Sequence, residues 1–330
     1  STLLHYWLDE IEKGVNSTIV PDPEHTSFLE LSAEDLDGTL STFFLNTQLY
    51  AGSFININQK RYLELYSVIK DCNVIIGDME DDESETAKTV LGTAWSLRSI
   101  CYYNLLQSFC EPYQSETATE TLGLPLVDEF DMEAKPGRSN QKETIEFIQK
   151  GFRNALSYNV TNKDYLFTAQ VTKAYMARFL FWTQDWESAI TYAKEVLEQY
   201  PMLEAEEYSE SINQKFSKGK NIIMASYTTE DDMGVLNYTS AQSTVSKRPV
   251  CKNLVELLNN TPNDVRKTNA FNAQRIPTKK VTTKFRSEEL CLIIAESYAH
   301  LNNTTEALKY LNLLRSKRIT QNYIAYTMDN

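Results

Sequence analysis

One spacing in the sequence restricts the fold more than any other feature. Small residues recur twelve positions apart within helix-like stretches, first as Ala177 and Ala189, with Pro201 twelve positions further on. The same interval separates Ala295 from Ala307. Small side chains let two antiparallel helices approach closely, and a proline stops the second helix because its ring clashes with the preceding turn. The sequence therefore predicts two helical hairpins of the same kind.

This spacing is typical of tetratricopeptide (TPR) repeats, and the neighbouring residues fit it. Thr168 begins the predicted first helix, which runs to about Thr183, and Asp185 caps a second helix that ends at Tyr200. In the downstream copy, Tyr298 occupies the large aromatic position of the repeat. A single hairpin of this kind is common in helical proteins, but the second matching copy indicates helical-repeat packing.

Further helices are predicted from apolar residues at three- and four-residue steps. Two of them cover 59–78 and 87–109, and a short one covers 252–259. Asn140 followed by Glu143 is a capping-box signature, which predicts the start of another helix.

Long loop-rich insertions separate these helices, and polar and turn-forming residues are frequent in them. The insertions cover 16–58, 111–138 and 203–285. The helical scaffold lies mainly in 59–109, 140–200 and 286–318. Gly accounts for only 10 of 330 residues, too few for a turn-dense sandwich or barrel. We therefore expect a single all-α domain over 1–330, built from TPR-like helical hairpins with long loop-rich insertions.

Charge and hydropathy exclude two classes of partner. Acidic residues outnumber basic ones by 45 to 32, and the resulting net charge of −13 opposes binding to a phosphate backbone. We therefore predict no nucleic-acid partner. The sequence also contains no apolar run of 18 residues that could cross a membrane.

The sequence lacks the common motifs for catalysis, metals and cofactors. It contains no GxGxxG, GxxxxGK[ST], GxSxG or HExxH motif. His5, His25 and His300 are isolated from one another, and the five cysteines form no CxxC pair, which favours free thiols. We expect no enzyme activity, no metal and no cofactor. Paired carboxylates for glycoside hydrolysis need proximity in space and no fixed spacing, so a hydrolase is a minor alternative.

Several stretches contain motifs that occur together in one protein family. The first is the run LRSICYYNLLQ at 97–107, followed by Pro112-Tyr113 and by GLPL at 123–126, and the second is Arg138-Ser139. They are similar to an Arg-Ala-x-x-Tyr-x-x-Leu helix, a Gly-x-Pro-Leu segment and the Arg-x-Ser start of the next helix. In these motifs the sequence resembles the SusD/RagB family of outer-membrane nutrient-binding lipoproteins.

The resemblance continues in the same order through most of the chain. The hairpin at 168–200, the Asp-x-Arg sequence at 264–266 and the helices at 286–318 are all similar to family segments. Family members usually carry a lipid-bearing Cys near the mature N-terminus. This sequence opens with Ser1 and lacks that Cys, so we expect a processed or trimmed product whose lipid anchor is absent from the chain.

The resemblance implies a function as well as an all-α fold. Members of the family are surface-exposed lipoproteins of the Gram-negative outer membrane. They capture an oligosaccharide or polysaccharide without catalysis and pass it to a SusC-like TonB-dependent transporter. Two alternatives stay open: a peptide or glycopeptide receptor of the same family, and a TPR-type adaptor that binds protein partners.

Sugar binding needs flat aromatic faces together with amide or carboxylate groups, and two insertions supply both. The first is 46–58, because the loop before the helix near Gln59 commonly contributes to the ligand surface in this family. The second is 227–238. The candidate ligand contacts are Tyr50, Phe54, Asn56, Asn58, Tyr227 and Tyr238. The alternative is that these rings only cover the helix ends, and Trp182 and Trp186 are assigned to core packing within their hairpin.

Overall fold

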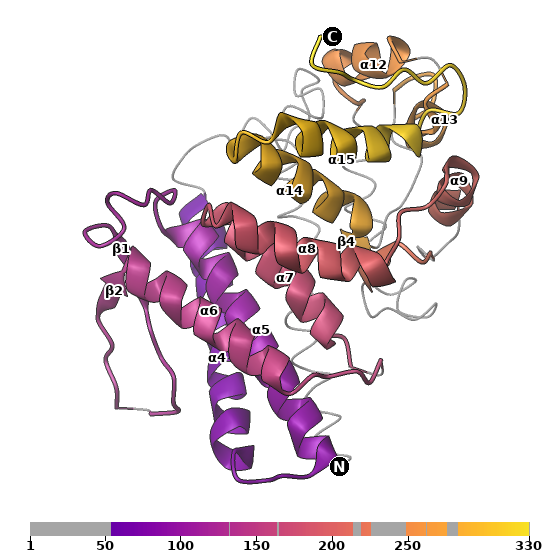
Figure 1. Ribbon diagram of the computed structural model, residues 1–330. Coiled ribbons are helices and arrows are strands. Elements are labelled where there is room, and N and C mark those ends of the chain that lie inside the picture. The colour runs from indigo at the N-terminus through magenta and orange to yellow at the C-terminus, as the bar shows by residue number, and fades with distance from the viewer. Residues whose placement is uncertain are drawn as a thin grey trace. The chain divides into compact units, whose positions relative to one another are not determined.

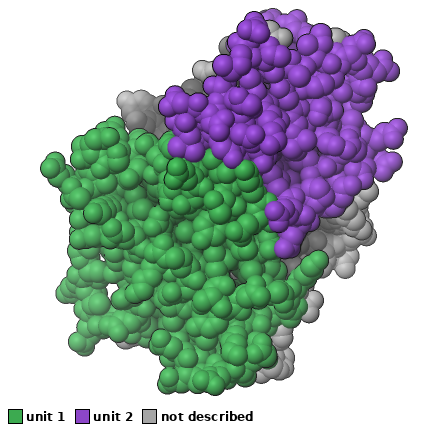
Figure 2. Space-filling model, in the orientation of Figure 1, with its two compact units in different colours: residues 1–19, 59–196 green, residues 20–58, 197–330 purple. Residues whose placement is uncertain are grey.

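A computed structural model describes seven stretches of the chain (Figure 1). They are residues 54–131, 133–163, 165–213, 219–225, 249–261, 263–275 and 283–329. The chain forms two compact units (Figure 2). Unit 1 consists of residues 1–19 and 59–196, and unit 2 of residues 20–58 and 197–330.

Unit 1 is built on long helices and one small sheet. The helices are α5 (Glu85–Phe109), α6 (Gln141–Ser157) and α7 (Ala169–Trp182), together with α4 (Phe54–Met79) from residue 59 on and α8 (Trp186–Gln199) up to residue 196. The strands β1 (Leu122–Pro125) and β2 (Arg138–Asn140) pair antiparallel. The largest fully buried apolar side chains of the unit include Tyr102, Phe152, Phe167 and Phe179. The all-α prediction is confirmed, since the strands are few and short.

The helix starts that the sequence predicted are present. Asn140 Oδ1 accepts from Glu143 N at 2.8 Å, and Glu143 Oε2 accepts from Asn140 N at 3.1 Å, which completes the capping box of α6. Thr168 caps α7 by accepting from Val171 N. One boundary was wrong, because α4 begins at Phe54 and not near Gln59. Asparagine is a weak helix former, so local propensity did not reveal this extra helical stretch.

The two hairpins with the twelve-residue spacing share the same turn. Gln184 joins α7 to α8 with a φ of 64°, and Asn302 joins α14 (Ser287–His300) to α15 (Thr304–Ser316) with a φ of 59°. In each turn the next residue caps the second helix through its side-chain oxygen: Asp185 accepts from Ser188 N, and Asn303 from Glu306 N. Local sequence therefore fixes both turns in the same way.

The motif residues at 98 and 102 hold the irregular segment that follows α5. The Tyr102 hydroxyl lies 2.8 Å from Val127 N and 3.0 Å from Val127 O. Arg98 Nη1 donates to Asp128 O at 3.2 Å and to Asn73 Oδ1 at 2.6 Å. Tyr66 donates to the carbonyl of Pro125 at 2.8 Å. Side chains of α4 and α5 thus fix a stretch that has little regular structure of its own.

Gly123 in β1 has no room for a side chain. A Cβ at this position would meet Asn140 O and Thr144 Oγ1 far inside van der Waals contact. Gly123→Ala is therefore expected to force β1 from β2 and to lower the free energy of unfolding by about 1–3 kcal/mol. Gly137→Ala is the matched control, because nothing lies within 4 Å of its added methyl group. Chemical denaturation of both variants tests this, and equal stability would contradict it.

Unit 2 contains shorter elements around the second hairpin. The helices before it are α9 (Ala205–Asn213), α12 (Lys252–Asn259) and α13 (Val265–Ala270). The strands β3 (Ile222–Ala225) and β4 (Thr283–Arg286) pair antiparallel, with Ile222 opposite Arg286. Helix α12 confirms the prediction for 252–259, whereas α9 and α13 were not predicted. Among the described residues, no helix is both long enough and apolar enough to span a membrane.

Candidate functional site

The six predicted ligand contacts lie either outside the described residues or at the start of the first described helix. Tyr50, Tyr227 and Tyr238 lie outside the described residues. Phe54, Asn56 and Asn58 belong to the first turns of α4, where the backbone alone is described.

The turns of α4 that follow contact α5. Tyr62 lies eight positions after Phe54, and its ring centroid is 5.1 Å from that of Phe109, edge to face. Tyr62 also lies 4.8 Å from Tyr66. Arg61 Nη2 donates to Asn104 Oδ1 at 3.3 Å. The start of α4 therefore lies beside the last turns of α5, and aromatic rings mark this contact.

A second group of rings surrounds the same turns of α5. Tyr103 lies 6.4 Å from Trp182 at the end of α7. Tyr113, from the irregular segment after α5, lies 6.3 Å from Trp182 on a tilted plane. Six residues separate Tyr103 from Phe109, which is about 9 Å along a helix. Both ring groups thus meet the last two turns of α5.

We call Tyr62, Phe109, Tyr113 and Trp182 the aromatic end of unit 1. All four are half-buried, so each keeps part of its surface accessible. The sequence assigned Trp182 to the core, but it closes α7 at the last residue of the helix, where burial is incomplete. Trp186 is half-buried as well and packs edge-on against Phe181.

Amide side chains are present on the same turns of α5 as these rings. Asn104 is half-buried, and Gln107 is exposed on the same turns of α5. Burial raises the pKa of Tyr113, so its phenol stays neutral and able to donate a hydrogen bond at physiological pH. Partly exposed rings beside hydrogen-bonding groups are the chemistry that recognises sugars, since the ring covers the apolar face and the amides reach the hydroxyls.

The buried cysteines do not provide a nucleophile. Burial raises the pKa of Cys72 and of Cys291 to about 12, and that of Cys101 well above its ordinary value. The thiolate is the reactive form, so these thiols are inert near pH 7. Within the described stretches, no group of three or more His, Cys, Asp or Glu side chains could hold a metal ion.

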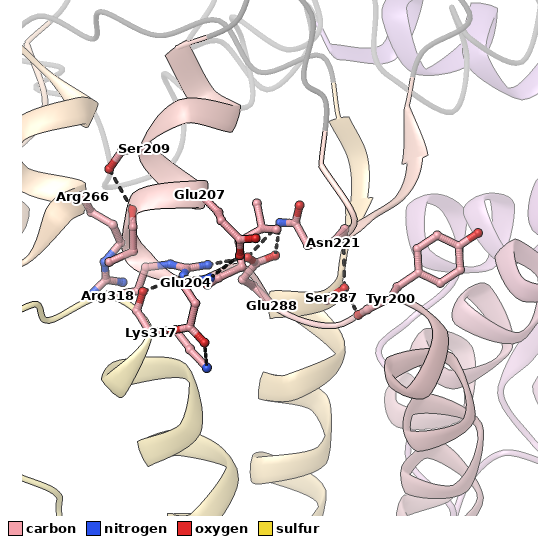
Figure 3. Close-up of polar contacts among 12 residues, drawn as sticks. Tyr200, Glu204, Glu207, Ser209, Asn221, Arg266, Ser287, Glu288, Lys317 and Arg318 are labelled. Carbon is pink, nitrogen blue, oxygen red and sulfur yellow. Dashed lines mark hydrogen bonds and ion pairs between the residues drawn. The ribbon is translucent and has the colours of Figure 1, made fainter.

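The main cluster of charged groups in unit 2 surrounds Arg318 (Figure 3). Arg318, only 2% exposed, forms an ion pair with Glu288 and donates to Leu203 O at 3.0 Å. Its guanidinium lies 4.0 Å from the centre of the Tyr208 ring. Desolvation lowers the pKa of Arg318, but the group stays charged because its ordinary value is so high.

Glu288 extends this cluster to the sheet of unit 2. It accepts from Asn221 Nδ2 at 2.9 and 3.1 Å, and the neighbouring Ser287 donates to the carbonyls of Tyr200 and Asn221 (Figure 3). The charges therefore hold together the end of α8, the start of β3, α14 and the residues after α15. Since its central groups are buried and paired with one another, we interpret the cluster as structural.

Comparison with protein families gives two matches. Residues 30–181 match a SusD-like family model described as starch-binding and associating with the outer membrane. Residues 175–201, which include most of α7 and all of α8, match a tetratricopeptide-repeat model. No curated protein is similar enough in sequence to count as a relative.

Several solved structures share the fold. A SusD superfamily protein from Bacteroides fragilis has a TM-score of 0.77 at 16% identity, covering 100% of this chain and 82% of its own. A SusD-like carbohydrate binding protein from Bacteroides vulgatus has a TM-score of 0.74 at 18% identity, covering 98% and 77%. A SusD superfamily protein from Bacteroides thetaiotaomicron has a TM-score of 0.70 at 20% identity, covering 82% and 68%.

Proposed function

We propose that the chain is a SusD-like protein and that it binds an oligosaccharide or polysaccharide at the cell surface without catalysis. The observation that carries the proposal is the family match over residues 30–181, whose description is starch-binding. That stretch includes α4, α5 and all of α7 except its last residue, so Tyr62, Phe109 and Tyr113 of the aromatic end lie within it and Trp182 directly follows it. The aromatic end is therefore the part of the described structure that we assign to ligand.

We assign the protein to the outer membrane for the same reason. The matching family model is described as associating with that membrane. A lipid anchor would attach the protein, and a SusC-like TonB-dependent transporter would receive the ligand. Release to a transporter requires weak and reversible binding, which a few ring contacts of about 1 kcal/mol each would provide.

The two alternatives predict different ligands. A peptide or glycopeptide receptor of the same family would bind peptides through the same rings. The match of residues 175–201 to a TPR model favours an adaptor, in which α7 and α8 would contact a protein partner. The chemistry of half-buried rings beside amide groups fits a sugar better, because an adaptor has no need of tyrosine faces at the end of its helices.

Phe109→Ala combined with Tyr113→Ala is expected to weaken glycan binding by about 2 kcal/mol, roughly 30-fold, through the loss of two stacking faces. Calorimetry with a panel of soluble polysaccharides, oligosaccharides and peptides measures this loss of affinity. Because we propose no catalysis, the protein should release no reducing ends from the same glycans. The proposed contacts Tyr50 and Phe54 form a second double variant, for which we also expect weaker binding.

Tyr158→Ala is the matched control for these variants. Tyr158 is half-buried like Tyr113, but it lies next to Gly92, near the start of α5 and away from Phe109. Its loss should leave binding unchanged. Binding of peptides alone would point to the peptide receptor, and an absence of both ligands would overturn the glycan-binding proposal.

A further inference from the structure

The segment after α15 presents an unusual set of exposed side chains in unit 2. Residues 319–329 follow α15 as the yellow trace in Figure 1. Ile324 and Met328 are each 72% exposed, and Tyr326 between them is 45% exposed. Single exposed apolar residues are ordinary, but three at alternate positions of one short segment call for an explanation.

Two side chains of α15 hold this exposed segment in place. The side-chain amide of Asn312 accepts from Tyr326 N and donates to Tyr326 O, both at 2.8 Å. Tyr323 donates its hydroxyl to Asn312 Oδ1 at 2.8 Å. Arg315 Nη1 donates to Ile324 O at 3.1 Å. The segment is thus fixed by a pattern that resembles one rung of a β-ladder, although no strand lies there.

The Tyr326 ring is supported on one side. The Arg315 guanidinium carbon lies only 3.4 Å from the ring centroid, so the guanidinium stacks on one face of the ring. Because Tyr326 is nevertheless 45% exposed, much of its accessible area belongs to the opposite face and the outer edge. The ring is therefore a flat surface with one face covered, and its position is fixed by Asn312 and Arg315.

Hydrogen-bonding groups remain available at the edge of this surface. Among the described residues, the Tyr326 hydroxyl has no hydrogen-bond partner. Arg315 uses Nη1 for both of its hydrogen bonds, which leaves Nε and Nη2 without an acceptor in the described structure. A pyranose ring stacked on Tyr326 would find these donors next to its hydroxyl groups.

From this arrangement we propose that Tyr326 and Arg315 of unit 2 form a second glycan contact, in addition to the one proposed in unit 1. Its ligand is a hexopyranose unit of the same polysaccharide, so the inference rests on the proposed glycan-binding function. A fixed aromatic face binds sugar with little loss of side-chain freedom, which favours weak but selective stacking.

The test uses the full chain with soluble amylopectin, maltoheptaose and the polysaccharides of the panel. Tyr326→Ala should weaken binding to the preferred polysaccharide about fivefold or more, as expected for one lost ring contact, whereas Tyr326→Phe should keep most of it. Met328→Ala is the matched control, because Met328 is exposed on the same segment and offers no flat ring. Thermal melting should be unchanged in Tyr326→Phe and in the control.

A second measurement is independent of folding. Nitration by tetranitromethane, mapped by mass spectrometry, should modify Tyr326 in the free wild-type protein and should be reduced when the polysaccharide is bound. If the wild type binds a glycan but Tyr326→Ala binds equally well and nitration is unprotected, the second contact is wrong and the proposed function stands. If the wild type binds no glycan, both fail. Equal losses of glycan binding in Tyr326→Ala and Met328→Ala would show that the flat ring makes no contribution of its own and would also overturn the inference.

Discussion

Replacing Glu288 by alanine is expected to lower the free energy of unfolding of unit 2 by about 3–5 kcal/mol, because the change leaves a buried guanidinium without its carboxylate. Arg318 is only 2% exposed, and Glu288 is its ion-pair partner. The variant also removes the acceptor that Asn221 uses at 2.9 Å. A charge that is buried and unpaired loses its hydration without compensation, which makes this one of the two largest effects we expect.

Lys220→Ala is the matched control for Glu288→Ala. Lys220 pairs with Glu207 at 2.8 Å, but both side chains are about half exposed, so water and salt screen the pair. Its loss should cost less than about 1 kcal/mol. Urea denaturation of both variants and of Glu288→Ala combined with Arg318→Met measures the difference. The double variant should be more stable than the sum of the two single losses in free energy of unfolding predicts. If Glu288→Ala loses no more stability than Lys220→Ala, the structural role of the Glu288–Arg318 pair is contradicted.

Arg98→Met is the second variant with a large expected effect, about 3 kcal/mol in the free energy of unfolding. Arg98 is only 3% exposed and lies over the rings of Trp95 and Phe147, with distances of 4.1 and 5.4 Å to their centroids. Methionine fills the same space but leaves Asn73 Oδ1 and the Asp128 carbonyl without their donor. The irregular segment after β1 should therefore loosen before the helices unfold.

Hydrogen exchange detects this loosening directly. Backbone amides of residues 126–131 should lose protection in Arg98→Met, while those of α6 should keep it. Arg98→Lys should be intermediate, because lysine keeps the charge but lacks the planar guanidinium that bonds and stacks at once. Arg153→Met on the exposed surface of α6 is the control and should change neither stability nor exchange. Unchanged protection at 126–131 in Arg98→Met would show that Tyr102 and Asn73 suffice to hold the segment.

Most helices could be predicted because their signals are local. The capping box of Asn140 and Glu143, the cap of Thr168 and the short helix at 252–259 all depend on residues within one or two turns. Elements that rely on tertiary contacts were missed. Helix α13 has only six residues, and its start at Asp264 is fixed by a bridge to Ile319, far away in the sequence.

The sequence also did not reveal the structural role of Arg98 and Tyr102. Arg98 and Tyr102 stood out as part of a family-like run, but their neighbours in space are Asp128 and Val127 in a segment without periodicity. Nothing in the spacing shows that a helix side chain bonds to backbone groups some 25 to 30 residues later. Only the packing of α4 and α5 against that segment made the structural role of the motif apparent.

The sequence alone determined that this protein is a helical, TPR-like chain similar to the SusD family. Helix periodicity, helix caps and the twelve-residue spacing all depend on residues that are close together in the sequence, so the sequence alone reveals them. Only the tertiary structure assembled the aromatic end, because Tyr62, Phe109 and Trp182 come from three helices that are far apart in the chain. The tertiary structure also decided that Trp182 is partly accessible and that Tyr326 is held on Arg315 with one face open. The exposed fraction of a side chain depends on which helix ends pack together, and no local sequence pattern indicates that packing.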